Sequence, residues 1–134
     1  MSLTIGQELP TREFKITRES LVRYAGASGD FNAIHYRDDV AQAVGLPGVL
    51  AHGMLTMGAA VQCVVDFLGD SGKVLDYQVR FTKPVLVDAV TGATLIVNAT
   101  VVEIYEAEKI ARIDLSATAD GVVVLGKAQV RVRI

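Results

Sequence analysis

The sequence contains a single cysteine, Cys63, and no tryptophan among its 134 residues. One cysteine cannot form a disulfide within the chain, which fits a protein of the reducing cytoplasm. The formal net charge is −2, and the chain lacks the basic run with which a protein follows a nucleic-acid backbone. We therefore expect a cytoplasmic protein that binds no nucleic acid.

A long, uninterrupted apolar run is also missing. The longest such segment, Met54 to Leu68, is broken by Gln62 and Asp66 and is too short to cross a bilayer, so no membrane insertion is expected. Hydrophobic residues nevertheless make up 51% of the chain, which argues against disorder. The length predicts one domain, residues 1–134, and no repeat or linker divides it.

The first half of the chain is predicted to be helical. Thr17 can cap a helix over residues 18–27, and a short helix is expected over residues 38–44. A third helix is predicted from Gly53 to Leu68. Because it is apolar on nearly every face, we expect protein to surround it.

The second half alternates apolar and polar residues with the period of two that is typical of strands. Four such segments are expected, at residues 75–82, 93–101, 111–118 and 127–134. Each has one apolar and one polar face, which indicates an antiparallel sheet. The fold class is therefore α+β, with a curved antiparallel sheet wrapped around a buried central helix, an arrangement known as the hotdog fold.

The candidate chemistry lies in the loops that join these helices. Asp30 and His35 share one glycine-containing loop, and Gly53 follows His52 at the head of the apolar helix. A carboxylate and an imidazole can act as general base and general acid. The first amides of a helix lack intrahelical acceptors and lie at the positive end of its dipole. Together these residues favour proton chemistry beside a carbonyl group.

Three stretches of the sequence resemble one known family. The run Tyr24-Ala25-Gly26-Ala27-Ser28-Gly29-Asp30-Phe31-Asn32-Ala33-Ile34-His35 is similar to the hydratase motif of the MaoC-like dehydratases, the R-specific enoyl-CoA hydratases. Ala51-His52-Gly53-Met54 resembles their second signature, and residues 77–81 a third stretch. One departure is Ala33, where the family usually has proline; it puts the rigidity of the loop and the preferred acyl length in doubt.

The resemblance implies a lyase of fatty acid metabolism that reversibly hydrates a trans-2-enoyl thioester to the (3R)-hydroxyacyl thioester. The thioester would be carried by CoA or by an acyl carrier protein. Asp30 would act as base on water, His35 would hold the same water and transfer the C2 proton, and the Gly53 N–H would polarise the carbonyl. Asn32 and His52 are candidate substrate-binding residues, and no cofactor or metal is required.

Several of these residues also have a structural interpretation. Asp30 could cap the following turn, Asn32 could support the loop, and His52 could be a packing residue. Asp30, His35 and His52 could form a two-histidine, one-carboxylate iron site, although their spacing along the chain is poor for it.

Two other functions stay open at this point. A hotdog thioesterase would hydrolyse the same class of thioester. A non-catalytic acyl-binding or scaffold subunit would need neither Asp30 nor His35. Because a single hotdog sheet has open edges, we expect pairing with a second hotdog subunit, as a homodimer or a heterodimer.

Overall fold

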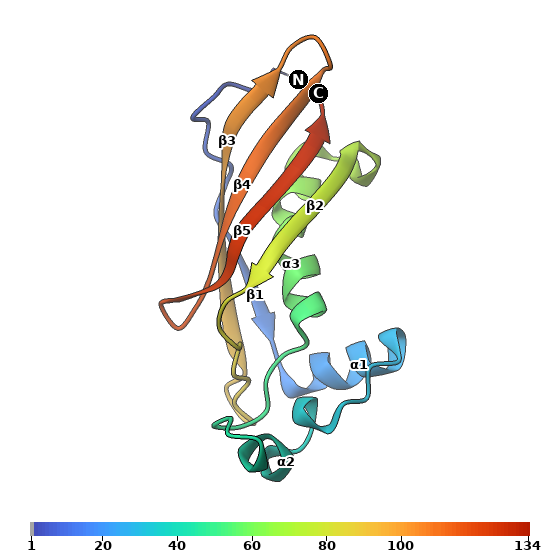
Figure 1. Cartoon of the computed structure of the whole chain (residues 1–134), viewed down its shortest axis with the longest axis vertical. Helices are drawn as coiled ribbons and strands as arrows, with labels where there is room; N and C mark the ends of the chain where they lie inside the picture. Colours follow the sequence, from blue (N-terminus) through green and yellow to red (C-terminus); the bar gives the residue numbers. More distant parts are fainter. Residues whose placement is uncertain (1) are drawn as a thin grey trace.

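The computed structural model describes residues 2–134, which form one antiparallel sheet with a long helix against it (Figure 1). The strands of the sheet are β1 (Arg12–Ile16), β2 (Val74–Phe81), β3 (Ala93–Tyr105), β4 (Ile110–Ala119) and β5 (Val122–Arg133). They lie in the order β1-β3-β4-β5-β2, so β1 and β2 are the edge strands. The predictions of an α+β fold and of an antiparallel sheet are confirmed.

β1 is a strand that the sequence pattern did not predict. Its five residues place just two apolar side chains, Phe14 and Ile16, on one face, and this alternation is too short to be recognised. Pairing with β3 stabilises it, with Ile16 opposite Ala93. Such a short strand is stabilised mainly by its hydrogen-bonded partner, which lies far away in the sequence. Its own five residues therefore do not predict a strand.

The hydrophobic core lies between the sheet and helix α3 (Gly53–Leu68). The faces predicted to be buried on β3 and β4 are buried in the structure, where Leu95, Val97 and Ile113 are fully enclosed. Burial of apolar surface contributes roughly 25 cal/mol per Å². The alternation therefore reports which face of each strand contacts the helix.

β2 departs from the predicted alternation. Leu75 and Phe81 were expected on the buried face but are 39% and 55% exposed. The register of β2 against β5 shifts between Val74 and Asp76 and again near Arg80. The first shift adds a residue to β2 at Leu75 and turns that side chain out of strict alternation, which is common at sheet edges. Phe81 keeps its predicted face, where it lies close to Gly53, and it is exposed because β2 is an edge strand.

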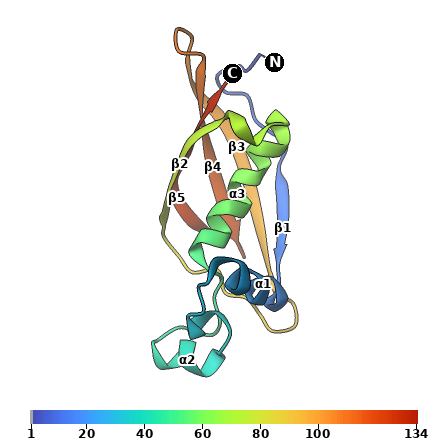
Figure 2. The same ribbon diagram turned by 90° about the vertical axis from the view of Figure 1, so that its right-hand side faces the viewer.

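Helix α3 lies lengthwise against one face of the sheet, between β1 and β2 in the view of Figure 2. It begins at Gly53 and ends at Leu68, as predicted, and Gly69 follows in the left-handed conformation with φ 69°. One side of the helix is open, since Met54 is 59% exposed. The expectation that protein surrounds the helix is therefore wrong for a single chain, because one sheet covers only one side of it. No helix within residues 2–134 is long and apolar enough to span a bilayer.

The remaining helices gather at the end of the sheet where α3 begins (Figure 1). α1 (Arg18–Ser28) starts at the predicted cap, where the Thr17 hydroxyl accepts a hydrogen bond from the Ser20 N–H at 3.2 Å. The remaining short elements are a 3₁₀ turn (Ala33–His35), helix α2 (Asp38–Ala43) and a second 3₁₀ turn (Ser71–Lys73) that leads into β2. This arrangement places the loop after α1 over the first turn of α3.

Candidate functional site

The loop after α1 brings a carboxylate and an imidazole together. His35 Nε2 lies 3.9 Å from Asp30 Oδ2. The His35 residue is buried at 8% exposure, while the Asp30 side chain is half exposed. A separation of 3.9 Å is too long for a direct hydrogen bond, but a water molecule can bind to both atoms.

Hydrogen bonds to the main chain orient both groups. Asp30 Oδ1 accepts from the Asn32 N–H at 3.2 Å, which leaves Oδ2 facing His35. His35 Nδ1 donates to the Leu50 carbonyl at 2.7 Å, so Nε2 is the nitrogen that can bind or release a proton. Asp30 therefore supports the turn with one oxygen and faces His35 with the other, and the two interpretations of this residue are compatible.

Asn32 supports the loop in the structure. Its Oδ1 accepts a hydrogen bond from the Ile34 N–H at 3.3 Å and caps the 3₁₀ turn that carries His35. This is the local side-chain to main-chain bonding that asparagine favours in turns. A direct contact between Asn32 and substrate stays a prediction.

His52 lies beneath the pair and contacts both of its members. The residue is 1% exposed. Its ring stacks on that of His35 with centroids 3.8 Å apart and planes at 22°, and its Nε2 donates to the Asp30 carbonyl at 3.1 Å. The edge of Tyr24 packs against it at a centroid distance of 4.7 Å. The structure therefore gives His52 a packing and orienting position, and a contact between His52 and substrate stays a prediction.

The surroundings of His52 favour its neutral form. Burial lowers the pKa of His52, the hydrogen bond to the Asp30 carbonyl raises it in part, and the nearby His35 lowers it again. Its Nδ1 is buried without a hydrogen-bond partner. A neutral ring leaves an acceptor unpaired there, whereas a protonated ring would leave a buried charged donor, which costs far more.

Replacement of His52 by phenylalanine should flatten the pH dependence of stability. The pKa of His52 is about 6.5 in the unfolded chain and lower in the folded protein. The unfolded chain therefore binds a proton first as the pH falls, and the folded protein loses stability between about pH 6.5 and its own lower pKa. Between pH 7.5 and 5.5, the free energy of unfolding should fall by up to about 1.4 kcal/mol more in the wild type than in His52→Phe. Urea unfolding at both pH values measures this difference, and parallel pH dependences would contradict a neutral buried His52.

Gly53 places a free amide next to this pair. It follows His52 directly, and the His52 carbonyl accepts hydrogen bonds from the N–H groups of Leu55 and Thr56, at 3.1 and 3.2 Å. Within residues 2–134, the Gly53 N–H donates no hydrogen bond. An unpaired amide at the positive end of a helix can stabilise negative charge that develops on a substrate oxygen.

A cavity of about 320 Å³ opens at this amide. His35 and Gly53 line one wall, and Phe81 and Lys83, from the end of β2 and the loop after it, line another. Most of the wall is apolar. The cavity therefore combines polar groups at one wall with surface that suits an acyl chain.

The ring of Phe81 lies close to Gly53. A Cβ atom at this position would lie 3.0 Å from Cε1 of Phe81. The φ angle of Gly53 is not in the left-handed region, so the backbone itself does not require glycine. Phe81 was predicted as a strand residue and not as a wall of the site. The Leu50 carbonyl was also missed, because a main-chain acceptor leaves no signal in the sequence.

Asp30, His35 and His52 lie close enough to be tested as metal ligands, since each offers a ligand atom and these atoms lie within 4.8 Å of one another. The fold therefore brings the three side chains together although their spacing along the sequence is unfavourable for a metal site. The ring geometry disfavours a shared ion, because the in-plane lone pairs of two stacked imidazoles run nearly parallel and do not converge. His35 Nδ1 and His52 Nε2 are also already hydrogen-bonded to carbonyl oxygens.

Comparison with known proteins assigns the family. Residues 2–120 match the family model described as "MaoC like domain". The chain belongs to the MaoC-like domain family. The resemblance drawn from the Asp30–His35 and His52–Gly53 motifs is thereby confirmed.

Individual relatives agree with this assignment. The "3-hydroxyacyl-thioester dehydratase X" of Mycobacterium tuberculosis is 39% identical over 83 residues, which is 62% of this chain and 29% of that protein. A solved structure named "MaoC-like dehydratase" has a TM-score of 0.96 at 36% identity, over 98% of this chain and 41% of that one. This chain therefore spans less than half the length of either relative.

A third similarity concerns the fold. An (R)-hydratase from A. caviae, described as involved in PHA biosynthesis, has a TM-score of 0.86 at 21% identity, over 99% of this chain and 98% of that one. At this identity the match shows the fold alone. With the more similar MaoC-like dehydratase structure, it confirms the predicted hotdog fold.

Proposed function

We propose that this chain catalyses the reversible hydration of a trans-2-enoyl thioester to the (3R)-hydroxyacyl thioester. The observation that carries the proposal is the pair formed by Asp30 Oδ2 and His35 Nε2, 3.9 Å apart, with His35 in the wall of a cavity that also contains Gly53. Membership of the MaoC-like family and the 39% identity with a 3-hydroxyacyl-thioester dehydratase support it.

In the proposed mechanism, one water molecule binds between Asp30 and His35. Asp30 accepts a proton from this water as its oxygen forms the bond to C3, and the electrons of the C2–C3 double bond move toward the carbonyl oxygen. In this mechanism His35 starts with a proton on both ring nitrogens and delivers the Nε2 proton to C2. The proton that Asp30 took from water then passes to Nε2, which restores the pair. The net result is addition of H and OH, and dehydration is the reverse.

The carbonyl end of the substrate would lie at the first turn of α3. The Gly53 N–H would donate to the thioester oxygen and stabilise the enolate-like charge that develops there. The Leu50 carbonyl holds His35 Nδ1, so proton exchange is confined to Nε2, the nitrogen that faces Asp30.

The purified chain, incubated with crotonyl-CoA, should reduce the absorbance of the enoyl thioester without releasing a thiol. The product should be the R isomer, and prolonged treatment with EDTA should leave the rate unchanged. Free thiol without hydration would identify a thioesterase, and complete inactivity would favour a non-catalytic subunit. An S product, or activity lost with EDTA and restored by iron or zinc, would contradict the mechanism.

Pairing with a second hotdog subunit belongs to the same proposal. Phe31, Met54 and Phe81 are 63%, 59% and 55% exposed beside the site, and β2 is an open sheet edge. Large apolar side chains that gather at an open strand are typical of a surface that another protein covers. We expect a homodimer or a heterodimer. The mass of the purified chain in solution identifies a homodimer, whereas a heterodimer forms only when a second hotdog chain is present.

A further inference from the structure

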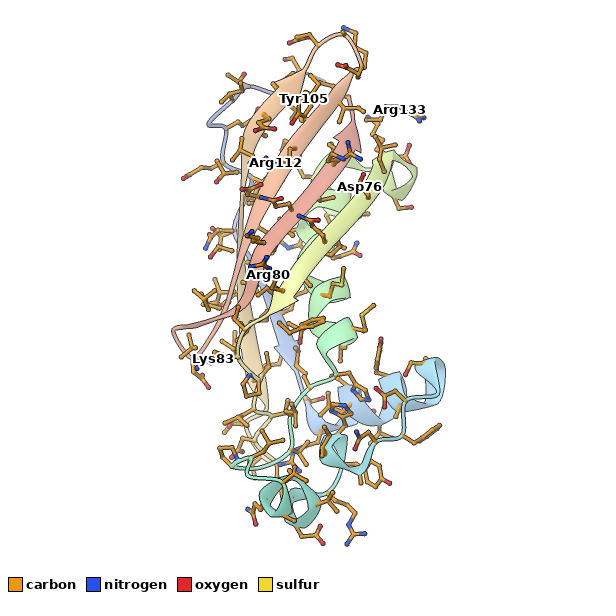
Figure 3. The ribbon with its side chains drawn as sticks, in the orientation of Figure 1. Asp76, Arg80, Lys83, Tyr105, Arg112 and Arg133 are labelled. Atoms are coloured by element: carbon orange, nitrogen blue, oxygen red, sulfur yellow. The ribbon has the colours of Figure 1, made fainter. Side chains whose placement is uncertain are left out.

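A short two-stranded ladder lies beside the site, outside the main sheet. The chain after β2 runs past Lys83 toward the end of the sheet where α1 and α2 lie (Figure 3). There residues 85–87 pair antiparallel with residues 49–51, and Leu50 lies opposite Leu86. The pairs on either side of this bridge contribute one main-chain hydrogen bond each, at 2.8 and 2.9 Å. Three residues of the ladder also line the cavity of the site.

An ion pair completes one end of this ladder. Directly opposite residues of an antiparallel pair can exchange two main-chain hydrogen bonds. The Val87 N–H donates to the Val49 carbonyl at 2.9 Å, but the Val49 N–H donates to Asp38 Oδ1 at 2.9 Å. Arg18 donates to the same oxygen through Nη2 at 2.9 Å and to the Val87 carbonyl through Nε at 2.5 Å. The two side chains, here called the Arg18–Asp38 clamp, therefore take the place of the second main-chain bond.

The surroundings of Asp38 favour this arrangement. The Val49 N–H and the Arg18 guanidinium hold the pKa of Asp38 below its usual range, so the carboxylate is ionised at neutral pH. Gly48 leaves room for it, since a Cβ at that position would lie 3.0 Å from Asp38 Oδ1. Val49 is buried, so loss of the carboxylate would deprive an enclosed N–H of its acceptor, which is unfavourable.

The ladder decides where the Leu50 carbonyl points. In an extended strand, the main-chain groups of successive residues face opposite edges. The residues on either side of Leu50 are bonded to residues 85–87, so the groups of Leu50 face the other way. There its N–H donates to the Ile34 carbonyl at 3.3 Å, and its carbonyl accepts from His35 Nδ1 at 2.7 Å. The position of Val49 in the ladder therefore fixes the acceptor that orients His35.

We propose that Arg18 and Asp38 are positioning residues, which hold the Leu50 carbonyl against His35 Nδ1. The inference rests on the proposed function, in which His35 exchanges its proton at Nε2. Neither Arg18 nor Asp38 lines the cavity, so both act through Leu50. Without the clamp, residue 49 is free to leave the ladder and the Leu50 carbonyl to turn away. Either ring nitrogen of His35 can then carry the proton of the neutral form.

The tautomer of His35 tests the clamp without any substrate. The chain has two histidines, and His35→Gln identifies the signals of His35 by their absence. Nitrogen NMR spectra are recorded at alkaline pH, where imidazole rings are generally neutral. In the wild type the neutral His35 ring should carry its proton on Nδ1. In Asp38→Ala the Nδ1 signal should move toward that of an unprotonated ring nitrogen, because two tautomers then exchange.

Matched variants separate the acceptor from a general effect on α2. Asp38→Asn keeps an oxygen that can accept from the Val49 N–H, and it should keep the wild-type tautomer. Asp39→Ala removes the neighbouring acid, which pairs with Arg37 in the same first turn, and it should also keep that tautomer. Where Asp38→Ala does not fold, Arg18→Met replaces it. Arg18→Met keeps an apolar stem without the donors and should move the Nδ1 signal in the same direction.

Turnover should follow the tautomer. Misplacement of a group by about 1 Å can reduce a rate by roughly 100-fold. Asp38→Ala should therefore hydrate crotonyl-CoA roughly 10- to 100-fold more slowly than the wild type. Asp38→Asn and Asp39→Ala should stay near the wild-type rate.

The outcomes separate the clamp from the proposed function. An unchanged His35 tautomer in folded Asp38→Ala, or in Arg18→Met where that variant takes its place, would overturn the clamp. An equal change in Asp38→Asn or Asp39→Ala would also overturn it, as would a changed tautomer at the wild-type rate. A tautomer that changes in Asp38→Ala alone, in a chain whose wild type hydrates no enoyl thioester, would support the clamp and contradict the proposed function.

Discussion

Asp30→Asn and His35→Ala should each reduce the turnover of enoyl-thioester hydration by at least about 100-fold, because each removes one partner of a general acid–base pair. The Asp30 replacement is informative because it is nearly isosteric. The asparagine Oδ1 can still accept from the Asn32 N–H, so the turn is preserved while the proton-accepting group is lost. The initial rate of absorbance loss with crotonyl-CoA measures the effect.

A matched carboxylate checks that the loss is specific. Asp39→Asn removes an exposed acid nearby, whose partner is Arg37, and should leave the rate unchanged. His35→Gln complements His35→Ala, since an amide can still donate to the Leu50 carbonyl but cannot exchange a proton. Turnover near the wild-type value in Asp30→Asn or His35→Gln would show that the assigned role of that residue is wrong.

Gly53→Val should abolish hydration more strongly than it lowers stability. Its Cβ would press on the ring of Phe81, which is half exposed and can move, so the free energy of unfolding should fall by about 1–3 kcal/mol. The added methyl groups would enter the cavity where the thioester oxygen must approach the amide. Loss of one such donor interaction reduces kcat by about 10²–10³, and KM should also rise.

Gly58→Val is the matched control for this substitution. Gly58 lies in the same helix, and a Cβ at that position would meet nothing within 4 Å. It should unfold at an equal or slightly higher denaturant concentration, because valine is a better helix former than glycine, and it should keep its turnover. Comparable activity in the two variants would contradict the assignment of the Gly53 amide to the carbonyl oxygen.

The prediction from sequence was most accurate where structure depends on local pattern. The buried faces of β3 and β4 follow directly from alternation, because successive side chains of a strand point to opposite faces. The bounds of α3 follow from Gly53, which opens the long, mainly apolar segment, and from Gly69, which follows it. The edge strands were predicted less well, since β1 depends on its pairing with β3 and β2 contains register shifts.

The sequence by itself determined the family, the order of the main elements after β1 and the residue types needed for proton transfer, because these reside in short motifs and in periodicity. The tertiary structure alone decided how those residues meet. It stacks His52 on His35, points His35 Nδ1 at the Leu50 carbonyl and places Phe81 over Gly53. These contacts join segments that are far apart in the chain, and their geometry is set by sheet register and helix placement, which no local pattern encodes.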